Sequence, residues 1–255
     1  MRFAVLIPAR MASQRLPGKP LADLLGKPLI LHVCERAQAS GAESVLVATD
    51  DERVRDACAA AGYQAQMTAR SHASGMDRIA ELVNRLGWED AQIVVNLQGD
   101  EPLMPSAVIR QVAALLDGRA EAQMATLCTP IHTLTEFLNP NVVKLVADRA
   151  GNALYFSRAP IPWNREGVNA GLESQQHWQG ALRHIGLYAY RVGTLRQLAS
   201  TPPCELEQVE KLEQLRALWL GMKIAVDVAR ETPGPSVDTA GDLKQAAVLL
   251  QKIRQ

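Results

Sequence analysis

Short apolar runs that alternate with helical segments are the feature of this sequence that most constrains its fold. Residues 2–7, 44–49 and 92–97 are such runs, rich in strand-forming residues. Between the first two, residues 28–40 begin with a proline and are followed by Gly41, which is typical of a helix. Strands that alternate with helices form parallel sheets with right-handed crossovers. We therefore expect an α/β domain with a mixed, mainly parallel sheet flanked by helices.

The second half of the chain has a different pattern. Residues 142–147 and 153–157 read as strands joined by a turn at 148–151, which indicates a β-hairpin. We expect a single domain over residues 1–255, with a lid or dimerisation subregion at about 130–200 and a polar flap at 164–179. The remaining expected strands are 64–67, 123–129, 184–190 and 223–228, and the remaining helices are 77–86, 105–116, 205–220 and 239–253.

Composition excludes several classes of protein. The 255 residues carry a formal net charge of zero, whereas nucleic-acid-binding proteins usually have a clear basic excess. The four cysteines lie far apart, without the spacing of a zinc site or a disulfide framework. No apolar run approaches the roughly 18 residues of a membrane span. We expect a cytoplasmic protein with neither a nucleic-acid nor a membrane partner.

A stiff basic loop follows the first strand. It carries Arg10, Ser13, Arg15 and Lys19, and Pro17 and Pro20 stand on either side of Gly18-Lys19 and oppose helix formation. Guanidinium groups bind phosphate oxygens bidentately, and ligands of open α/β sheets bind at the carboxyl ends of strands. The spacing of a Walker loop is absent, so phosphates would be held mainly by side chains. The alternative is a solvated basic turn.

Two aspartates form the second set of candidate residues. Asp100 follows the apolar run at 92–97, and Asp238 lies just before the last expected helix. A carboxylate facing a phosphate-binding loop is typical of a Mg²⁺ site, in which substrate phosphates supply further oxygen ligands. Each aspartate alone could instead be a helix cap.

The sequence also resembles a known family, 3-deoxy-manno-octulosonate cytidylyltransferase, also called CMP-Kdo synthetase. The resemblance runs in order from residue 2 to about 242. Its motifs are Ile7-Pro-Ala-Arg10, Arg15-Leu-Pro-Gly-Lys-Pro20, Ala48-Thr-Asp-Asp51, Asn96-Leu-Gln-Gly-Asp-Glu-Pro102, Tyr155-Phe-Ser-Arg158 with Pro160-Ile-Pro-Trp163, His184-Ile-Gly-Leu-Tyr-Ala-Tyr-Arg191, Leu212-Glu-Gln-Leu-Arg216 and Val237-Asp-Thr239.

The resemblance implies a nucleotide-diphospho-sugar transferase-like fold, a homodimer, and transfer of CMP from CTP to the sugar acid Kdo for lipopolysaccharide synthesis. It further implies a catalytic set, a nucleotide-binding set, a set around the sugar acid and two Mg²⁺ ligands. The catalytic residues would be Asp100, Asp238, Lys19 and Arg15, the nucleotide-binding residues Pro8, Ala9, Arg10, Ser13, Arg15, Lys19, Arg78 and Gln98, the sugar-acid residues Arg158, His184, Tyr188, Glu213 and Gln214, and the metal ligands Asp100 and Asp238.

Two positions depart from the family pattern, and several other functions remain open. Met76 stands where the family commonly has Thr, and Ser236 where it commonly has Gly. The alternatives are a CMP-sialate synthetase, an 8-amino-Kdo cytidylyltransferase, a hexose-1-phosphate nucleotidyltransferase and a non-catalytic nucleotide-binding regulator. For His184 and Glu213 the alternative roles are a buried strand histidine and a solvated helix face.

Overall fold

The fold is built on one mixed β-sheet. The computed structural model describes residues 1–13, 15–72, 74–165 and 178–254. In this part of the chain the main sheet has nine strands, and the order along its principal path is β11-β7-β10-β6-β1-β4-β5. β10 is antiparallel to its neighbours β6 and β7, whereas β1, β4, β5 and β6 pair in parallel, as do β7 and β11. The expected mixed, mainly parallel sheet is therefore confirmed.

The strands of the main sheet begin and end close to the positions expected from the apolar runs. They are β1 (Phe3–Ala9), β4 (Ser44–Thr49), β5 (Gln64–Met67), β6 (Ile93–Asn96), β7 (Met124–Pro130), β8 (Lys144–Ala147), β9 (Ala153–Ser157), β10 (Leu182–Arg191) and β11 (Ile224–Val228). A separate small hairpin, β2 (Asp23–Leu24) and β3 (Lys27–Pro28), follows the single 3₁₀ turn η1 (Lys19–Leu21).

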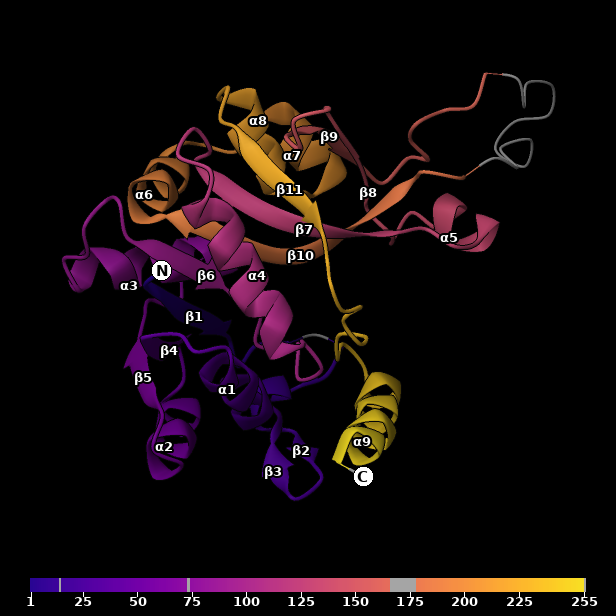
Figure 1. The fold of residues 1–255 in the computed structure, drawn as a ribbon. Helices are drawn as coiled ribbons and strands as arrows, with labels where there is room; N and C mark the ends of the chain where they lie inside the picture. Colours follow the sequence, from indigo (N-terminus) through magenta and orange to yellow (C-terminus); the bar gives the residue numbers. More distant parts are fainter. Residues whose placement is uncertain (14, 73, 166–177, 255) are drawn as a thin grey trace.

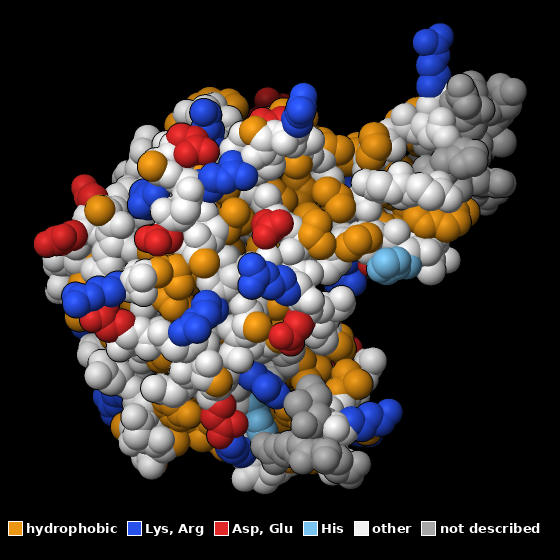
Figure 2. All heavy atoms as spheres, in the orientation of Figure 1, with side chains coloured by type: hydrophobic (Ala, Val, Ile, Leu, Met, Phe, Trp, Pro, Cys, Tyr) orange, Lys and Arg blue, Asp and Glu red, His pale blue; other side chains and the backbone are white. Residues whose placement is uncertain are grey.

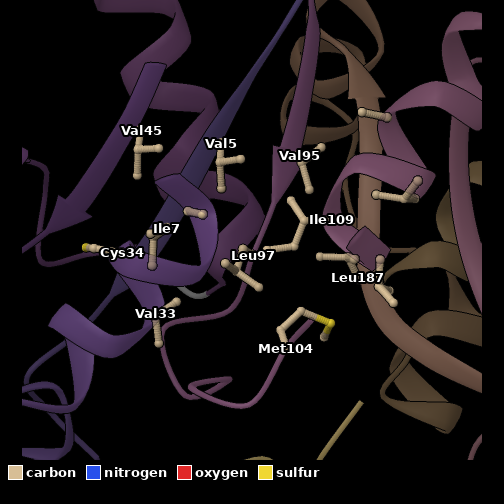
Figure 3. Close-up of a cluster of buried hydrophobic side chains, with 14 of the residues drawn as sticks. Val5, Ile7, Val33, Cys34, Val45, Val95, Leu97, Met104, Ile109 and Leu187 are labelled. Atoms are coloured by element: carbon tan, nitrogen blue, oxygen red, sulfur yellow. The ribbon is translucent and has the colours of Figure 1, made fainter. Parts of the chain in front are cut away.

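Helices cover both faces of the sheet (Figure 1). One face packs against α1 (Leu29–Ala39), α2 (Glu52–Ala60) and α4 (Ser106–Asp117). The other packs against α3 (Gly75–Arg85), α6 (Val192–Ser200) and α8 (Gln214–Trp219). Alternate residues of β1 serve the two layers, since Val5 and Ile7 belong to the first core and Ala4 and Leu6 to the second. The side chains of the first core, from β1, α1, β6 and α4, point toward one another in Figure 3.

Two regions extend from the layered body. The hairpin of β8 and β9, with α5 (Leu134–Leu138), projects to one side (Figure 1). The last helix, α9 (Ala240–Arg254), lies beside the small β2–β3 hairpin, so the chain crosses from β11 to the opposite end of the molecule. Most of the flap expected at 164–179 lies outside the described residues.

One sequence-based expectation is wrong, and two helices were missed. Residues 205–220 do not form one long helix but two short ones, α7 (Glu205–Glu210) and α8, because Lys211 adopts a left-handed conformation with φ of 55°. Nothing in the helical pattern of apolar residues marks this break. The short helices α5 and α6 were not expected from the sequence. The apolar side of α6 packs against α3.

Candidate active site

A large open cavity lies where β1 and β6 end. Its volume is about 830 Å³, and it is lined by Pro8, Ala9, Arg10, Ala12, Ser13, Arg15, Lys19, Pro20, His72, Ser74, Gly75, Arg78, Gln98, Gly99, Asp100, Glu213 and Asp238. Gly99 lets the two strand ends converge, because a Cβ at this position would lie 2.8 Å from the carbonyl oxygen of Pro8. The cavity occupies the carboxyl-end crevice in which open α/β sheets bind ligands.

The basic loop and the two aspartates meet at one end of the cavity. Lys19 Nζ donates to Asp100 Oδ2 at 2.8 Å and to Asp238 Oδ1 at 3.0 Å. Arg15 Nη2 lies 2.8 Å from the same Asp238 oxygen. Burial by itself lowers the pKa of Lys19, but the contacts with Asp100 and Asp238 outweigh it and raise the pKa above its ordinary value. Residues far apart in the sequence therefore form one charged cluster.

Charge at this end of the cavity fits a hard cation. Both aspartates direct an oxygen to one ammonium group, and Mg²⁺ is commonly held by one or two carboxylates together with substrate phosphates. Burial raises the pKa of neighbouring Glu101 to about 8, with Asp100 and Asp238 adding to the effect. Within the described residues, no group of three or more His, Cys, Asp or Glu side chains could hold a metal by itself. The two carboxylates therefore fit a metal ion for which a bound triphosphate supplies further oxygen ligands.

The opposite wall comes from the start of α3 and the loop before it. Ser74 caps α3, its hydroxyl accepting from Asp77 N at 3.1 Å, and Gly75 lies against Pro8 and Gln98. Arg78 is buried, and its guanidinium is held by Asp50, Thr68 and Ala69. Because these contacts occupy its donors, Arg78 is a rigid part of the wall rather than a free cation.

Asp50 joins this wall to the basic loop. One carboxylate oxygen accepts from Arg78 Nη2 at 2.9 Å, and the other accepts from Met11 N at 3.1 Å. It was not among the expected site residues, although it lies in the Ala48-Thr-Asp-Asp51 motif directly after β4. Its position at a strand end was the available signal.

Glu213 forms the third wall. It is the N-cap residue of α8, at the end of the turn 211–213, and its carboxylate lies close to the hydroxyl of Ser74. Burial raises the pKa of Glu213 to about 7, helped by Asp77 and Glu207 and opposed by Arg216 and the Ser74 hydrogen bond. Burial raises the pKa of the Tyr188 and Tyr190 phenols of β10, and the Glu213 carboxylate adds to both shifts.

Four of the residues expected around the sugar acid are not among those that line the cavity. His184 is buried in β10, with its ring edge on Phe156 and Nε2 2.9 Å from Thr126 Oγ1. Burial lowers the pKa of His184 to about 3, so the imidazole is neutral. Tyr188 lies beside His184, with ring centroids 5.2 Å apart.

Gln214 and Arg158 are the other two. Gln214 is buried, and its Nε2 has no hydrogen-bond partner among the described residues. Arg158 donates from Nε to Glu210 O and from Nη1 to Pro140 O, at 2.7 and 3.0 Å. The structure thus brings together every expected nucleotide residue and Glu213, and leaves the other sugar-acid candidates outside the cavity surface.

His72 was missed by the sequence analysis. It lines the cavity, and its Nε2 is hydrogen-bonded to Glu81 of α3. Met76, one of the two departures from the family pattern, is 2% exposed and packs in the core with α3, so it faces away from the cavity.

The surface shows the balance of charges expected from a net charge of zero. Figure 2 shows basic and acidic side chains interspersed over the described part of one face, with hydrophobic side chains gathered toward the projecting arm. Among the described residues, no helix is long and apolar enough to cross a membrane.

Comparison with known proteins places these features in a family. A family model described as cytidylyltransferase matches residues 4–224. Two curated relatives named 3-deoxy-manno-octulosonate cytidylyltransferase are each 54% identical. The one from Thioalkalivibrio sulfidiphilus covers 98% of this chain and 100% of its own, and the one from Alkalilimnicola ehrlichii covers 97% and 96%.

Solved structures agree. One of CMP:2-keto-3-deoxy-manno-octonic acid synthetase complexed with CTP has a TM-score of 0.88 at 39% identity, covering 99% of both chains. A cytidylyltransferase from Leptospira borgpetersenii, at 15% identity and a TM-score of 0.64, covers 99% of this chain and 87% of its own and shares the fold. Together with the basic loop and aspartate pair at the strand ends, these matches show that the chain belongs to the 3-deoxy-manno-octulosonate cytidylyltransferase family.

Proposed function

We propose that the protein transfers CMP from CTP to Kdo, releasing pyrophosphate, in the cavity at the ends of β1 and β6. The observation that carries the proposal is the cluster of Lys19, Arg15, Asp100 and Asp238, which gathers both a triphosphate-binding loop and two carboxylates. Family membership and the CTP complex of a related synthetase support the choice of substrates.

The nucleotide is held by the residues around the basic loop. Arg10, Ser13, Arg15 and Lys19 bind the triphosphate, and Pro8, Ala9, Arg78 and Gln98 line the nucleoside. Asp100 and Asp238 would hold Mg²⁺, which would neutralise phosphate charge and lower the pKa of the attacking hydroxyl. Lys19, whose ammonium lies between the two carboxylates, is within the same cluster and can donate to a phosphate oxygen. The sugar hydroxyl then forms a bond to the α-phosphorus as the bond to pyrophosphate breaks, which requires in-line placement more than covalent help from the protein.

The sugar acid is placed at the Glu213 wall. Glu213 opens to the cavity and can accept from sugar hydroxyls, and Gln214 Nε2, which has no hydrogen-bond partner within the described ranges, is a potential donor beside it. Arg158, His184 and Tyr188 support this wall from behind, and Arg158 is proposed to serve the sugar carboxylate.

We further propose a single-domain homodimer that works in the cytoplasm. Large apolar side chains are exposed on adjoining elements, namely Leu154 on β9, Leu206 and Val209 on α7 and Trp219 on α8, and a second copy would bury them. All four cysteines are free thiols, as expected in a reducing compartment. Light scattering after gel filtration should give twice the mass of the 27.8 kDa chain, and a monomer would contradict the dimer.

A pyrophosphate-release screen tests the function. CTP, UTP, ATP and GTP are each combined with Kdo, 8-amino-Kdo, sialic acid or no acceptor, with and without Mg²⁺. We expect turnover with CTP and Kdo that depends on Mg²⁺, with UTP the next best nucleotide because it has the same pyrimidine ring. Equal turnover with GTP, or preference for sialic acid, would contradict the proposal, and faster turnover with 8-amino-Kdo would reassign the acceptor.

A further inference from the structure

The carboxylate of Glu210 joins two parts of the molecule that are separate in the sequence. Glu210 is the last residue of α7. Its carboxylate accepts from the hydroxyl of Ser157 at 2.6 Å and from the backbone N–H of Arg158 at 2.9 Å. Its own carbonyl accepts from Arg158 Nε at 2.7 Å. The end of α7 is therefore fixed to the end of β9 through three hydrogen bonds, two of them to a charged acceptor.

A buried lysine supports the same junction from the other side. Lys144 of β8 is fully buried, and its ammonium donates to the carbonyls of Asn139, Val142 and Arg158 at 3.0, 2.6 and 2.6 Å. An ammonium has three donors, so all of them are used. Burial lowers the pKa of Lys144 to about 8, which the nearby Glu210 carboxylate opposes. Such a group is costly to bury, and here it fixes backbone on both sides of the hairpin.

The junction lies directly before the cavity wall. Lys211, next to Glu210, takes the left-handed conformation that ends α7, and Glu213 and Gln214 then begin α8. No side chain caps the start of α8. The direction in which Glu213 enters the cavity is thus set by the backbone turn at 211–213. Glu207 holds this turn to α8 through Arg216 and to Leu212 N, and Glu210 holds it to the end of β9.

We propose that Glu210 and Lys144 are positioning residues that hold the turn at 211–213 so that Glu213, followed by Gln214 at the start of α8, faces the sugar acid. The proposal rests on the function proposed above, since it assigns Glu213 and Gln214 to the acceptor rather than to CTP. Neither Glu210 nor Lys144 lines the cavity, so each acts only through the backbone that it holds.

The variants E210Q, E210A and K144M test the proposal. E210A removes both acceptors, E210Q replaces one by a donor, and K144M keeps side-chain length while removing all three donors. R196M is the matched control, because Arg196 also fixes backbone, donating to Trp88 O at 2.6 Å and Asn84 Oδ1 at 2.8 Å, on the outer side of α6. E210Q is the mildest change and covers the case in which K144M does not fold.

Steady-state kinetics with both substrates and thermal melts provide the measurements. We expect E210A and K144M to raise the KM for Kdo about tenfold or more and to leave the KM for CTP within about twofold, as for loss of contacts to one substrate. E210Q should show a smaller rise in the same parameter. R196M should lower the melting temperature without changing either KM.

A pH profile separates positioning from a general loss of stability. If the turn moves, Glu213 becomes more solvated, so the acid limb of kcat/KM for Kdo should shift toward the ordinary carboxyl range in E210A. The groups that face Glu213 and remain unchanged are Ser74 and Asp77 on α3, Glu207 on α7, Arg216 on α8, and Tyr188 and Tyr190 on β10.

Three outcomes would overturn the inference. These are an unchanged KM for Kdo in the folded variants, an equal rise in both KM values, and a rise confined to R158K while E210A and K144M behave as wild type. The last result would mean that the proposed contact of Arg158 with the sugar carboxylate, and not the turn at 211–213, sets the KM for Kdo. If wild-type protein does not turn over CTP and Kdo at all, the proposed function has failed, which is distinct from any of these outcomes.

Discussion

We expect substitutions of Asp100 and Asp238 to have strongly non-additive effects on kcat. We consider the variants D100N, D238N and the double variant D100N/D238N. Asparagine keeps the shape of the side chain and one acceptor oxygen but removes the charge. If both carboxylates hold one Mg²⁺, either substitution breaks the site, and the second acts on a site that is already broken.

The expected magnitudes differ sharply between a metal site and two separate sites. A bound metal contributes several kcal/mol of transition-state stabilisation, and about 3–4 kcal/mol corresponds to a loss of about 10²–10³ in kcat for each single variant. For independent sites the double variant would lose the product, about 10⁴–10⁶. For one shared ion we expect it to lose no more than about tenfold beyond the worse single variant.

Stability should change little. The two aspartate side chains are 28% and 29% exposed, and each single variant leaves Lys19 paired with the other carboxylate. Exposed or half-exposed ion pairs contribute about 0–1 kcal/mol. For a domain of this size, 1 kcal/mol corresponds to about 2–4 °C in melting temperature, so this is the largest shift expected.

The measurement is kcat against Mg²⁺ concentration for the wild type and the three variants, with thermal melts in the absence of metal as the control. Multiplicative losses in the double variant would refute the shared site. A single variant with nearly wild-type kcat, or a drop in melting temperature large enough to account for its lost activity, would reduce that aspartate to a structural role.

Three further changes have defined outcomes. R158K keeps the charge but loses the planar guanidinium fork, which donates from separate nitrogens to Glu210 O and Pro140 O and which fits a carboxylate bidentately. We therefore expect a higher KM for Kdo at constant KM for CTP in the same kinetic assay; the reverse split would place Arg158 at the nucleotide. E213Q should melt at a higher temperature than wild type at pH 8 and at the same temperature at about pH 4. The reason is that the pKa of Glu213 is raised in the folded protein, so the wild type loses stability as the pH rises from the ordinary carboxyl pKa to about 7. A wild type that gains stability over that range would contradict a raised pKa for Glu213. E207Q should lower the free energy of unfolding in urea by about 3–5 kcal/mol, since it leaves the buried guanidinium of Arg216 without its carboxylate partner; a loss below about 1 kcal/mol would show that the carbonyls of Leu198 and Thr201 are sufficient partners.

Much of the fold could be predicted because its signals are local. The apolar run of β4 and the strand at 64–67 were expected with the bounds that the structure has, and α1 begins after Pro28 and ends before Gly41 as its flanking residues indicate. The failure at 205–220 has an equally local cause. A single left-handed residue, Lys211, divides the helix, and lysine carries no preference that would mark the position.

The candidate site divides in the same way. The basic loop could be recognised as a phosphate-binding segment because a strand end, two prolines, a glycine and three cations lie within one short stretch. Asp50 and His72 were missed because their roles depend on partners in other segments. Asp50 binds Met11 and Arg78, and His72 binds Glu81. Arg158 and His184 were expected to reach the substrate, and their positions outside the cavity lining depend on contacts with other segments, Arg158 with the carbonyl of Glu210 and His184 with Phe156 and Thr126.

The sequence by itself determined the alternation of strands and helices, the stiff basic loop and the motifs of the family, because each depends on residues that are neighbours along the chain. Only the tertiary structure decided that Asp100 and Asp238 share the ammonium of Lys19, and that Glu213 lies beside Ser74 in the cavity lining. These contacts join segments from opposite ends of the chain. They exist because the sheet order brings β1 beside β6 and the chain after β11 returns to the same edge, and such pairing leaves no periodic trace in the sequence.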